Sequence, residues 1–241
     1  MENLDYNKVN LSTENVHVLL INFSTFDFQN YMNYLTSNEI KRLGNINNIN
    51  NRNQFVASRV VIKKILSKYL KKIPNKIEFS FNKHGKPFIR DKYHNHRFEF
   101  NISHSDIYGL IAITLDNKIG VDIQKINHDI DIDSLSSRFF SENEKTQLMN
   151  LDKSKKIDAF HLGWARKESF IKAIGEGVAY GLDSFTVSLE KNDTKSILDI
   201  KNKKWHCYNI IDFENYKTAL TTEIKSKIIT SSNEVDISTN F

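Results

Sequence analysis

Three short segments of this chain carry acidic, basic and hydroxyl side chains in patterns that could bind a phosphate-rich ligand together with a divalent metal. Phe100–Ser105 reads FNISHS, Gly120–Ile123 reads GVDI, and Trp164–Gly177 reads WARKESFIKAIGEG. Carboxylate oxygens bind Mg2+, while lysine, serine and histidine side chains donate hydrogen bonds to phosphate oxygens. The combination is typical of an enzyme that acts on a phosphorylated substrate.

Two acidic side chains in these segments, Asp122 and Glu168, could supply oxygen ligands to Mg2+. This ion usually keeps several waters and takes other oxygens from substrate phosphates, so the protein contributes only a few ligands. In a strand, Asp122 and Gln124 point to the side opposite Val121 and Ile123. The alternative interpretation of Asp122 is a turn or capping residue at the end of that strand.

Glu168 and Lys172 lie four residues apart on a predicted helix, at the edge of its apolar face. A surface pair with this spacing stabilises a helix by roughly 0.2–0.5 kcal/mol and needs no further function. A carboxylate that borders an apolar face is costly, however, unless it is paired or coordinates something. The helix then runs into Gly175–Gly177, which indicates a glycine cap, a close approach to a ligand, or both.

Ser103 and His104 lie where a strand is predicted to run into a turn, and Lys86 lies in a tight turn with the sequence HGKP. Each of them could hold a phosphate, although a structural histidine and a solvated turn lysine are the alternatives. The sequence contains no Walker A loop, dinucleotide-binding glycine fingerprint or nucleophile elbow. It therefore gives no support to the usual cradles for ATP or NAD.

The composition predicts a soluble protein with an ordinary core. The chain has 241 residues, of which 39% are hydrophobic and 26% charged, and no apolar run is long enough to cross a membrane. The polar start MENLDYNK does not resemble a signal peptide, and the lone Cys207 suits a reducing compartment, so we expect a cytoplasmic protein. The net charge of +5 suits an anionic partner, and no nucleic-acid-binding motif is present.

The order of predicted elements repeats once along the chain. In the first half a strand at Val16–Phe23 and an Asn-rich loop at Asn45–Asn53 precede a long helix at Gln54–Lys71, and three strand-like runs follow at Ile77–Phe81, Arg97–Ile102 and Leu110–Leu115. In the second half a strand at Lys118–Ile123 precedes helical segments at Ser134–Phe139, Ser141–Asn150 and about Lys155–Ile174, and strand-like runs follow at Ser184–Leu189, Trp205–Ile211 and Tyr216–Thr222. Ser141 and Glu144 have the spacing of a capping box.

This repeated order predicts an α+β fold made of a pseudo-twofold pair of similar halves, with the active site in the cleft between them. We expect an N-terminal half at residues 1–117, a C-terminal half at 118–230 that carries the metal site, and a polar tail at 231–241. The order of the strands within each half does not follow from these patterns.

The succession GKPFI, FNISHS, IGVDI, RFFSENEK, WARKESFIKAIGEG and LDSFTVSL resembles the 4'-phosphopantetheinyl transferases of the surfactin-synthetase-activating type, from about Glu39 to Thr222. The resemblance implies a pseudo-dimer of two α+β halves. It also implies transfer of the phosphopantetheine arm of coenzyme A to a serine of an apo acyl or peptidyl carrier protein. Adenosine 3',5'-bisphosphate would be the second product.

The resemblance further implies roles for the residues of these motifs. Asp122 and Glu168 would be Mg2+ ligands, Glu168 would also help to deprotonate the attacking serine, and Lys172 would neutralise charge on the leaving group. The phosphates and sugar of coenzyme A would be held by three matching residues and by one further candidate on the first long helix, namely Lys86, Ser103, His104 and Arg59.

The chain departs from the family at Gln124, where bacterial members of this type usually carry Glu. An amide oxygen is a poorer ligand than a carboxylate, so either Gln124 is a weak third ligand or water takes its place. We expect activity with a raised Mg2+ requirement. The alternative is a non-catalytic protein that binds coenzyme A or carrier domains, although the intact Glu168 and Lys172 favour the enzyme.

The resemblance also bears on partners. Carrier proteins are commonly acidic, which suits the net charge of +5. The match to the single-chain type implies a monomer and favours nonribosomal peptide or polyketide synthesis, including antibiotic biosynthesis. Neither nucleic acid nor a membrane is expected as a partner, and the sequence does not identify the carrier.

Overall fold

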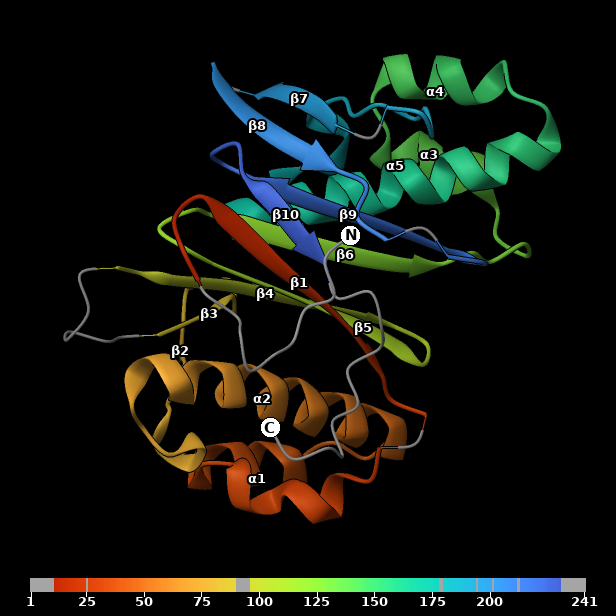
Figure 1. The fold of residues 1–241 in the computed structure, drawn as a ribbon. Coiled ribbons are helices and arrows are strands. Elements are labelled where there is room, and N and C mark those ends of the chain that lie inside the picture. The colour runs from red at the N-terminus through yellow and green to blue at the C-terminus, as the bar shows by residue number, and fades with distance from the viewer. Residues whose placement is uncertain are drawn as a thin grey trace.

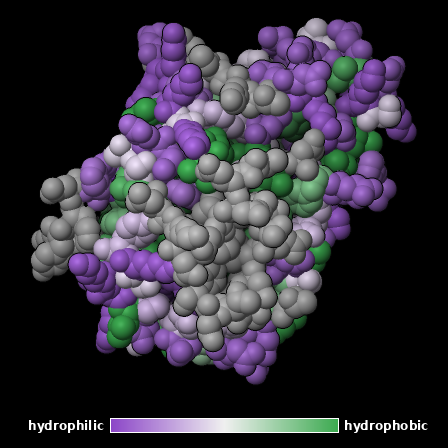
Figure 2. All heavy atoms as spheres, in the orientation of Figure 1, coloured by the Kyte–Doolittle hydropathy of each residue, from purple (hydrophilic) through white to green (hydrophobic). Residues whose placement is uncertain are grey.

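The structure is a computed structural model that describes residues 11–24, 26–89, 96–177, 180–193, 195–200, 202–211 and 213–230. The polar tail predicted at 231–241 lies outside the described residues. No helix in the described part is long and apolar enough to cross a membrane. Hydrophilic side chains dominate the described surface on the face drawn in Figure 2, with smaller hydrophobic areas among them.

The described residues of the N-terminal half form one long helix, one short helix and five strands. They are β1 (Asn15–Asn22), α1 (Ser37–Gly44), α2 (Ile49–Leu70), β2 (Ser80–Phe81), β3 (Pro87–Phe88), β4 (Phe98–Ser105) and β5 (Tyr108–Leu115), with 3-10 turns at Phe28–Tyr34 and Pro74–Lys76. The C-terminal half contains β6 (Ile119–Lys125), α3 (Ile132–Phe139), α4 (Glu142–Met149), α5 (Lys153–Ile174), β7 (Lys195–Ile200), β8 (Lys203–Tyr208), β9 (Tyr216–Thr222) and β10 (Lys227–Thr230), with a 3-10 turn at Leu182–Ser184.

The two halves share one strand order. In the first sheet the order is β10-β1-β5-β4, and in the second it is β6-β9-β8-β7. In each sheet the opening strand of the half pairs antiparallel with a strand from the end of that half, β1 with β5 and β6 with β9. The α+β fold with two similar halves is thus confirmed. The strand β10 then returns to the first sheet and pairs parallel with β1.

The long helices cover opposite faces of the two sheets (Figure 1). The helix α2 packs on the first sheet and α5 packs on β6 and β9 of the second. A third apolar cluster combines side chains of both sheets, among them Val18 from β1, Ala112 from β5, and Val121 and Ile123 from β6. The strands β1, β5 and β6 are therefore buried on both faces, which explains their nearly continuous apolar sequences.

Three expectations about local structure are wrong. The Asn-rich stretch Asn45–Asn53 is not all loop, because α2 begins at Ile49, and the side chain of Asn48 caps it by accepting a hydrogen bond from Asn51 N at 3.1 Å. The run Ser184–Leu189 forms no strand, and Val187 N donates instead to Glu144 Oε1 at 2.7 Å. The run Ile77–Phe81 contains strand only at Ser80–Phe81.

The predicted capping box at the start of α4 is confirmed. Ser141 N donates to Glu144 Oε2 at 2.7 Å, and Glu144 N donates to Ser141 Oγ at 3.4 Å. The Glu144 carboxylate also forms a fully buried ion pair with Lys167 of α5 at 2.7 Å. The cap therefore fixes α4 against α5 as well as starting the helix.

Candidate functional site

The segment FNISHS joins the two halves through side chains. Backbone N–H groups of β6 donate to alternate residues of β4: Val121 N to Asn101 Oδ1 at 2.8 Å, Ile123 N to Ser103 Oγ at 3.4 Å and Lys125 N to Ser105 Oγ at 2.9 Å. Alternate side chains of a strand share one face, so these three point to β6 together. The expected turn at Ser103–Ser105 is wrong, because these residues continue β4.

The glycine of GVDI allows α5 to lie directly on β6. A Cβ atom added to Gly120 would lie 2.1 Å from Ser169 O and 2.3 Å from Ala173 N, which are backbone atoms of α5. Only a residue without a side chain fits at this contact. The close approach brings the Asp122 side of the strand onto the helix that carries Glu168 and Lys172.

The Asp122 side chain is the centre of a polar cluster drawn from both halves. Its Oδ1 accepts hydrogen bonds from Ser103 Oγ at 2.8 Å and from Lys172 Nζ at 2.6 Å, and its Oδ2 accepts one from Gln124 Nε2 at 2.7 Å. The Asp122 side chain is only 2% exposed. Asp122 lies within β6, not at its end, so the turn or capping interpretation is wrong.

Glu168 completes the acidic part of the cluster. Burial raises the pKa of this half-buried carboxyl, the charge of Asp122 raises it further, and Lys172 lowers it. The two carboxyls are thus close enough for the charge of one to oppose ionisation of the other. A cation bound between two such carboxylates would offset their repulsion. The alternative of a Glu168–Lys172 surface pair is wrong, because the Lys172 ammonium instead forms an ion pair with the buried Asp122 carboxylate at 2.6 Å.

Side chains of this cluster could supply a few ligands to a divalent metal ion. Among the described residues no group of three or more acidic, histidine or cysteine side chains could hold a metal ion. The protein would offer two carboxylates, Asp122 and Glu168, and the neutral amide of Gln124. Mg2+ is commonly bound through one or two carboxylates with waters and phosphate oxygens in its other positions.

His104 lies at the edge of the same cluster. Its side chain is exposed at the end of β4, yet partial burial and the nearby Lys172 ammonium lower the pKa of its imidazole, while Asp122 raises it. The imidazole is therefore neutral at pH 7 and carries a single N–H donor. His104 points to the opposite side of β4 from Ser103.

Lys86 is not a solvated turn residue. Its Nζ donates to Ile119 O and to Ala173 O, both at 3.0 Å. Burial lowers the pKa of Lys86 to about 8. The turn between β2 and β3 therefore reaches the C-terminal half and holds the start of β6 and the end of α5 together.

Gly175 ends α5 with a left-handed backbone at φ 71°, and its N–H donates to Ile171 O at 2.9 Å. The glycine cap is thus confirmed. Asn82 Nδ2 donates to Gly175 O at 2.8 Å, and a Cβ on this glycine would lie 3.0 Å from Asn82 Nδ2 and 3.1 Å from Lys86 Cδ. The close approach here is made by the β2–β3 turn of the other half.

Arg59 belongs to a different cluster. Its Nε lies 3.4 Å from Glu39 Oε1, and its guanidinium lies over the rings of Phe55 and Phe79 at 5.1 and 5.0 Å. Burial lowers the pKa of Arg59 to about 10. Among the described residues no hydrogen bond or ion pair joins Arg59 to the Asp122 cluster, and its contact with coenzyme A stays a prediction.

The motif WARKES also contains two buried cations that the sequence patterns did not single out. Lys167 Nζ donates to Leu182 O at 2.7 Å and to Phe185 O at 2.6 Å, in addition to its ion pair with Glu144. Arg166 Nη1 donates to Ser188 O at 2.5 Å. Two adjacent basic residues within a largely apolar helix were the sequence feature that could have predicted these buried cations. Both anchor one side of α5 and leave Glu168 and Lys172 on the side of β6.

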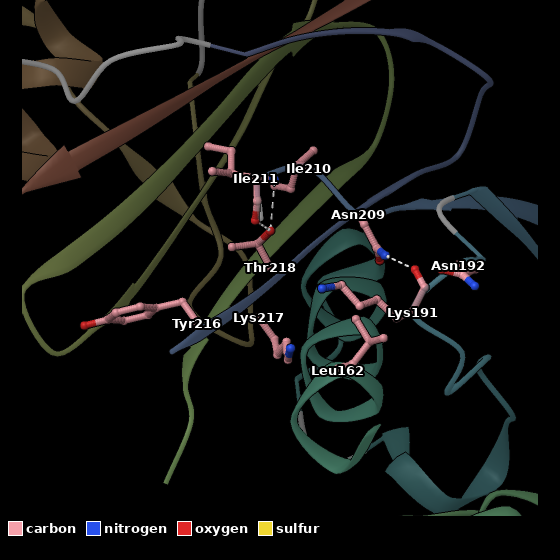
Figure 3. Close-up of a pocket in the computed structure, with 9 residues that line it drawn as sticks. All are labelled: Leu162, Lys191, Asn192, Asn209, Ile210, Ile211, Tyr216, Lys217 and Thr218. Atoms are coloured by element: carbon pink, nitrogen blue, oxygen red, sulfur yellow. Dashed lines mark hydrogen bonds between the residues drawn. The ribbon is translucent and has the colours of Figure 1, made fainter. Parts of the chain in front are cut away.

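A separate pocket of about 280 Å³ lies beside α5 (Figure 3). The residues that line it are Leu162, Lys191, Asn192, Asn209, Ile210, Ile211, Tyr216, Lys217 and Thr218. Lys217 is the cross-strand neighbour of Gln124, and its Nζ lies 2.9 Å from Asp158 Oδ2. This pocket includes none of the residues that contact Asp122.

Two family models match the chain. The model of the 4'-phosphopantetheinyl transferase superfamily matches residues 118–221. The model described as 4'-phosphopantetheinyl transferase, N-terminal, matches residues 22–115. Together they include every residue of the Asp122 cluster.

Curated proteins of the same description are similar in sequence. The 4'-phosphopantetheinyl transferase gsp of Aneurinibacillus migulanus is 38% identical over 66% of this chain and 63% of its own length. The transferase Sfp of Bacillus subtilis is 36% identical over 62% of this chain and 63% of its own length. HetI of Nostoc sp. is 34% identical over 53% of this chain and 54% of its own length. The chain thus spans between 54% and 63% of the length of these relatives.

Proposed function

Because the chain belongs to the 4'-phosphopantetheinyl transferase superfamily, we propose that it transfers the 4'-phosphopantetheine group of coenzyme A to a serine of an apo acyl or peptidyl carrier protein. The observation that carries this proposal is the buried Asp122 carboxylate, with Ser103, Gln124 and Lys172 within hydrogen-bond distance. Glu168 lies close enough for the charge of Asp122 to raise its pKa.

In the proposed reaction the serine oxygen forms a bond to the phosphorus that carries the pantetheine arm. The bond from that phosphorus to the bridging oxygen of the diphosphate breaks, and adenosine 3',5'-bisphosphate leaves with the electron pair. Glu168 takes the serine proton, and Lys172 neutralises negative charge on the leaving group. Positioned charges of this kind stabilise a transition state without a covalent enzyme intermediate.

Asp122 and Glu168 would hold Mg2+, with Gln124 as a weak third ligand or replaced by water. The ion, when bound, neutralises charge on the diphosphate. A divalent cation beside Glu168 also favours the ionised carboxylate, against the burial and the Asp122 charge that raise its pKa. Ser103, His104 and Lys86 would contact the phosphates and sugar of coenzyme A, and Lys86 would have to leave its two carbonyl partners to do so.

We also propose that the protein acts as a cytoplasmic monomer on acidic carriers. The support is the net charge of +5, which favours association with an acidic domain.

The test is intact-mass measurement of an apo acyl carrier and an apo peptidyl carrier after incubation with the protein, coenzyme A and Mg2+. The proposal predicts a gain of one phosphopantetheine group on the serine of at least one carrier. Asp122→Ala and Glu168→Ala should abolish that gain. A correctly folded protein that binds coenzyme A but leaves both carriers unmodified would instead be the non-catalytic homologue.

A further inference from the structure

Three donors already engage the Asp122 carboxylate. Ser103 Oγ and Lys172 Nζ donate to Oδ1 at 2.8 and 2.6 Å, and Gln124 Nε2 donates to Oδ2 at 2.7 Å. Lys172 Nζ also donates to Ser103 Oγ at 2.8 Å. A metal ion that took an oxygen of Asp122 would have to displace at least one of these donors or share an oxygen with it.

Lys172 is the donor that opposes a metal ion most strongly. It is the cation of the three, and its ammonium lies 2.6 Å from Asp122 Oδ1. Like charges at such distances repel strongly where the surroundings exclude water. Lys172 is also able to move, because its side chain is 28% exposed and long, whereas Ser103 is buried.

We propose that Lys172 is a latch that makes binding of the divalent metal and of coenzyme A interdependent. Without coenzyme A its ammonium stays on Asp122 and weakens metal binding. The diphosphate of coenzyme A offers the ammonium another anionic partner, so that Lys172 leaves Asp122 free. This inference rests on the proposed function, and it adds that the protein takes up metal poorly unless the coenzyme is present.

The coupling has a measurable size. If one ligand changes the affinity for another, the change is reciprocal and amounts to about 5–150-fold in typical allosteric pairs. Direct contact between the metal and the diphosphate would add to this factor. The contribution of Lys172 is measured without coenzyme A, where removal of its ammonium should raise the affinity for the metal.

The experiment is titration of the full-length protein with Mn2+, an EPR-visible substitute for Mg2+, with and without saturating coenzyme A. The wild-type protein should bind Mn2+ about tenfold more tightly with coenzyme A than without it. Equal affinities under both conditions would overturn the proposal without any variant.

The variant Lys172→Met should bind Mn2+ alone at least about fivefold more tightly than the wild-type protein, and its ratio of affinities with and without coenzyme should fall. Lys217→Met is the matched control, because it removes a nearby positive charge that pairs with Asp158 instead of Asp122. Lys172→Arg keeps the charge and should keep the weak binding of Mn2+ alone. If Lys172→Met and Lys217→Met raise the affinity equally, Lys172 acts only as a distant charge and the latch is refuted.

The two proposals fail in different ways. A wild-type protein that modifies a carrier but shows no coupling would refute the latch alone. A protein that binds no Mn2+ even with coenzyme A would refute the metal site itself, and with it both proposals.

Discussion

The Asp122 side chain is held in place because its neighbours donate hydrogen bonds to both of its oxygens. Among the residues that the structure describes, none donates a hydrogen bond to the Glu168 carboxylate, and burial together with the charge of Asp122 raises its pKa. The two carboxyls therefore differ in role although they lie in one cluster. The donors fix the Asp122 side chain, whereas the raised pKa of Glu168 suits the proton acceptor that we propose it to be.

Glu168→Gln should make the metal-free protein more stable at pH 7. The folded-state pKa of Glu168 lies above its unfolded value of 4.5, so its ionisation costs stability as the pH rises through that folded-state pKa. The gain should be about 0.5–2 kcal/mol, at the cost of activity. Denaturant unfolding in chelator measures it at pH 7 and again at pH 4.5, where the gain should shrink. A variant less stable than wild type at pH 7 would contradict this account of the carboxyl.

Gln124→Glu should lower the Mg2+ concentration needed for half-maximal activity and also lower the stability of the metal-free protein. The reason is that the substitution replaces a donor 2.7 Å from Asp122 by a second negative charge. Activity against Mg2+ concentration and thermal unfolding in chelator measure the two effects. An unchanged dependence on metal concentration would show that position 124 takes no part in holding the ion.

At the scale of elements, the site depends on the contact between β6 and α5. The Gly120 backbone touches α5, and Arg166 and Lys167 anchor the other side of that helix. Strand and helix periodicity predicted which side chains share a face within GVDI and within WARKES, and the family resemblance implied that the two segments form one site. These patterns did not reveal the packing role of Gly120, since a close approach of two backbones leaves no periodic signal.

Gly120→Ala should destabilise the protein by about 3 kcal/mol, because the new methyl group meets backbone atoms of α5 that no side-chain rotation can move away. Gly44→Ala is the matched control, since nothing lies within 4 Å of its added Cβ, and it should stabilise slightly, by about 0.5–1 kcal/mol. Urea unfolding of both variants measures the difference. Similar stabilities for the two would mean that α5 does not lie on β6 as described.

On the scale of the whole molecule, the described residues join the two halves through a shared apolar cluster and through several polar and backbone contacts. The β4 side chains bind the backbone of β6, the β2–β3 turn binds the end of α5, and β10 pairs with β1. The repeated order of elements predicted the halves but none of these joints. The four-residue strand β10 pairs with β1, which lies about 210 positions earlier in the chain. Short sequence patterns do not predict pairing between strands so far apart. The contact of Lys86 with the C-terminal half was not predicted, because a lysine in a turn is usually solvated.

Lys86→Met should change how stability depends on pH. Burial lowers the pKa of Lys86 to about 8 from 10.5, so between these values the unfolded chain binds more protons and rising pH stabilises the folded wild-type protein. The variant lacks this contribution, and the wild-type protein should gain on the order of 2 kcal/mol relative to it between pH 8 and 10. Denaturant unfolding at the two pH values measures the gain. Parallel pH dependences would mean that the ammonium remains in solvent.

The most direct test of the central claim is the position of a divalent ion bound together with coenzyme A. A crystal of the complex grown with Mn2+ should give an anomalous peak about 2.1 Å from carboxylate oxygens of both Asp122 and Glu168 and from an oxygen of the diphosphate. A peak that contacts the diphosphate but neither carboxylate, or that lies elsewhere in the molecule, would contradict the account.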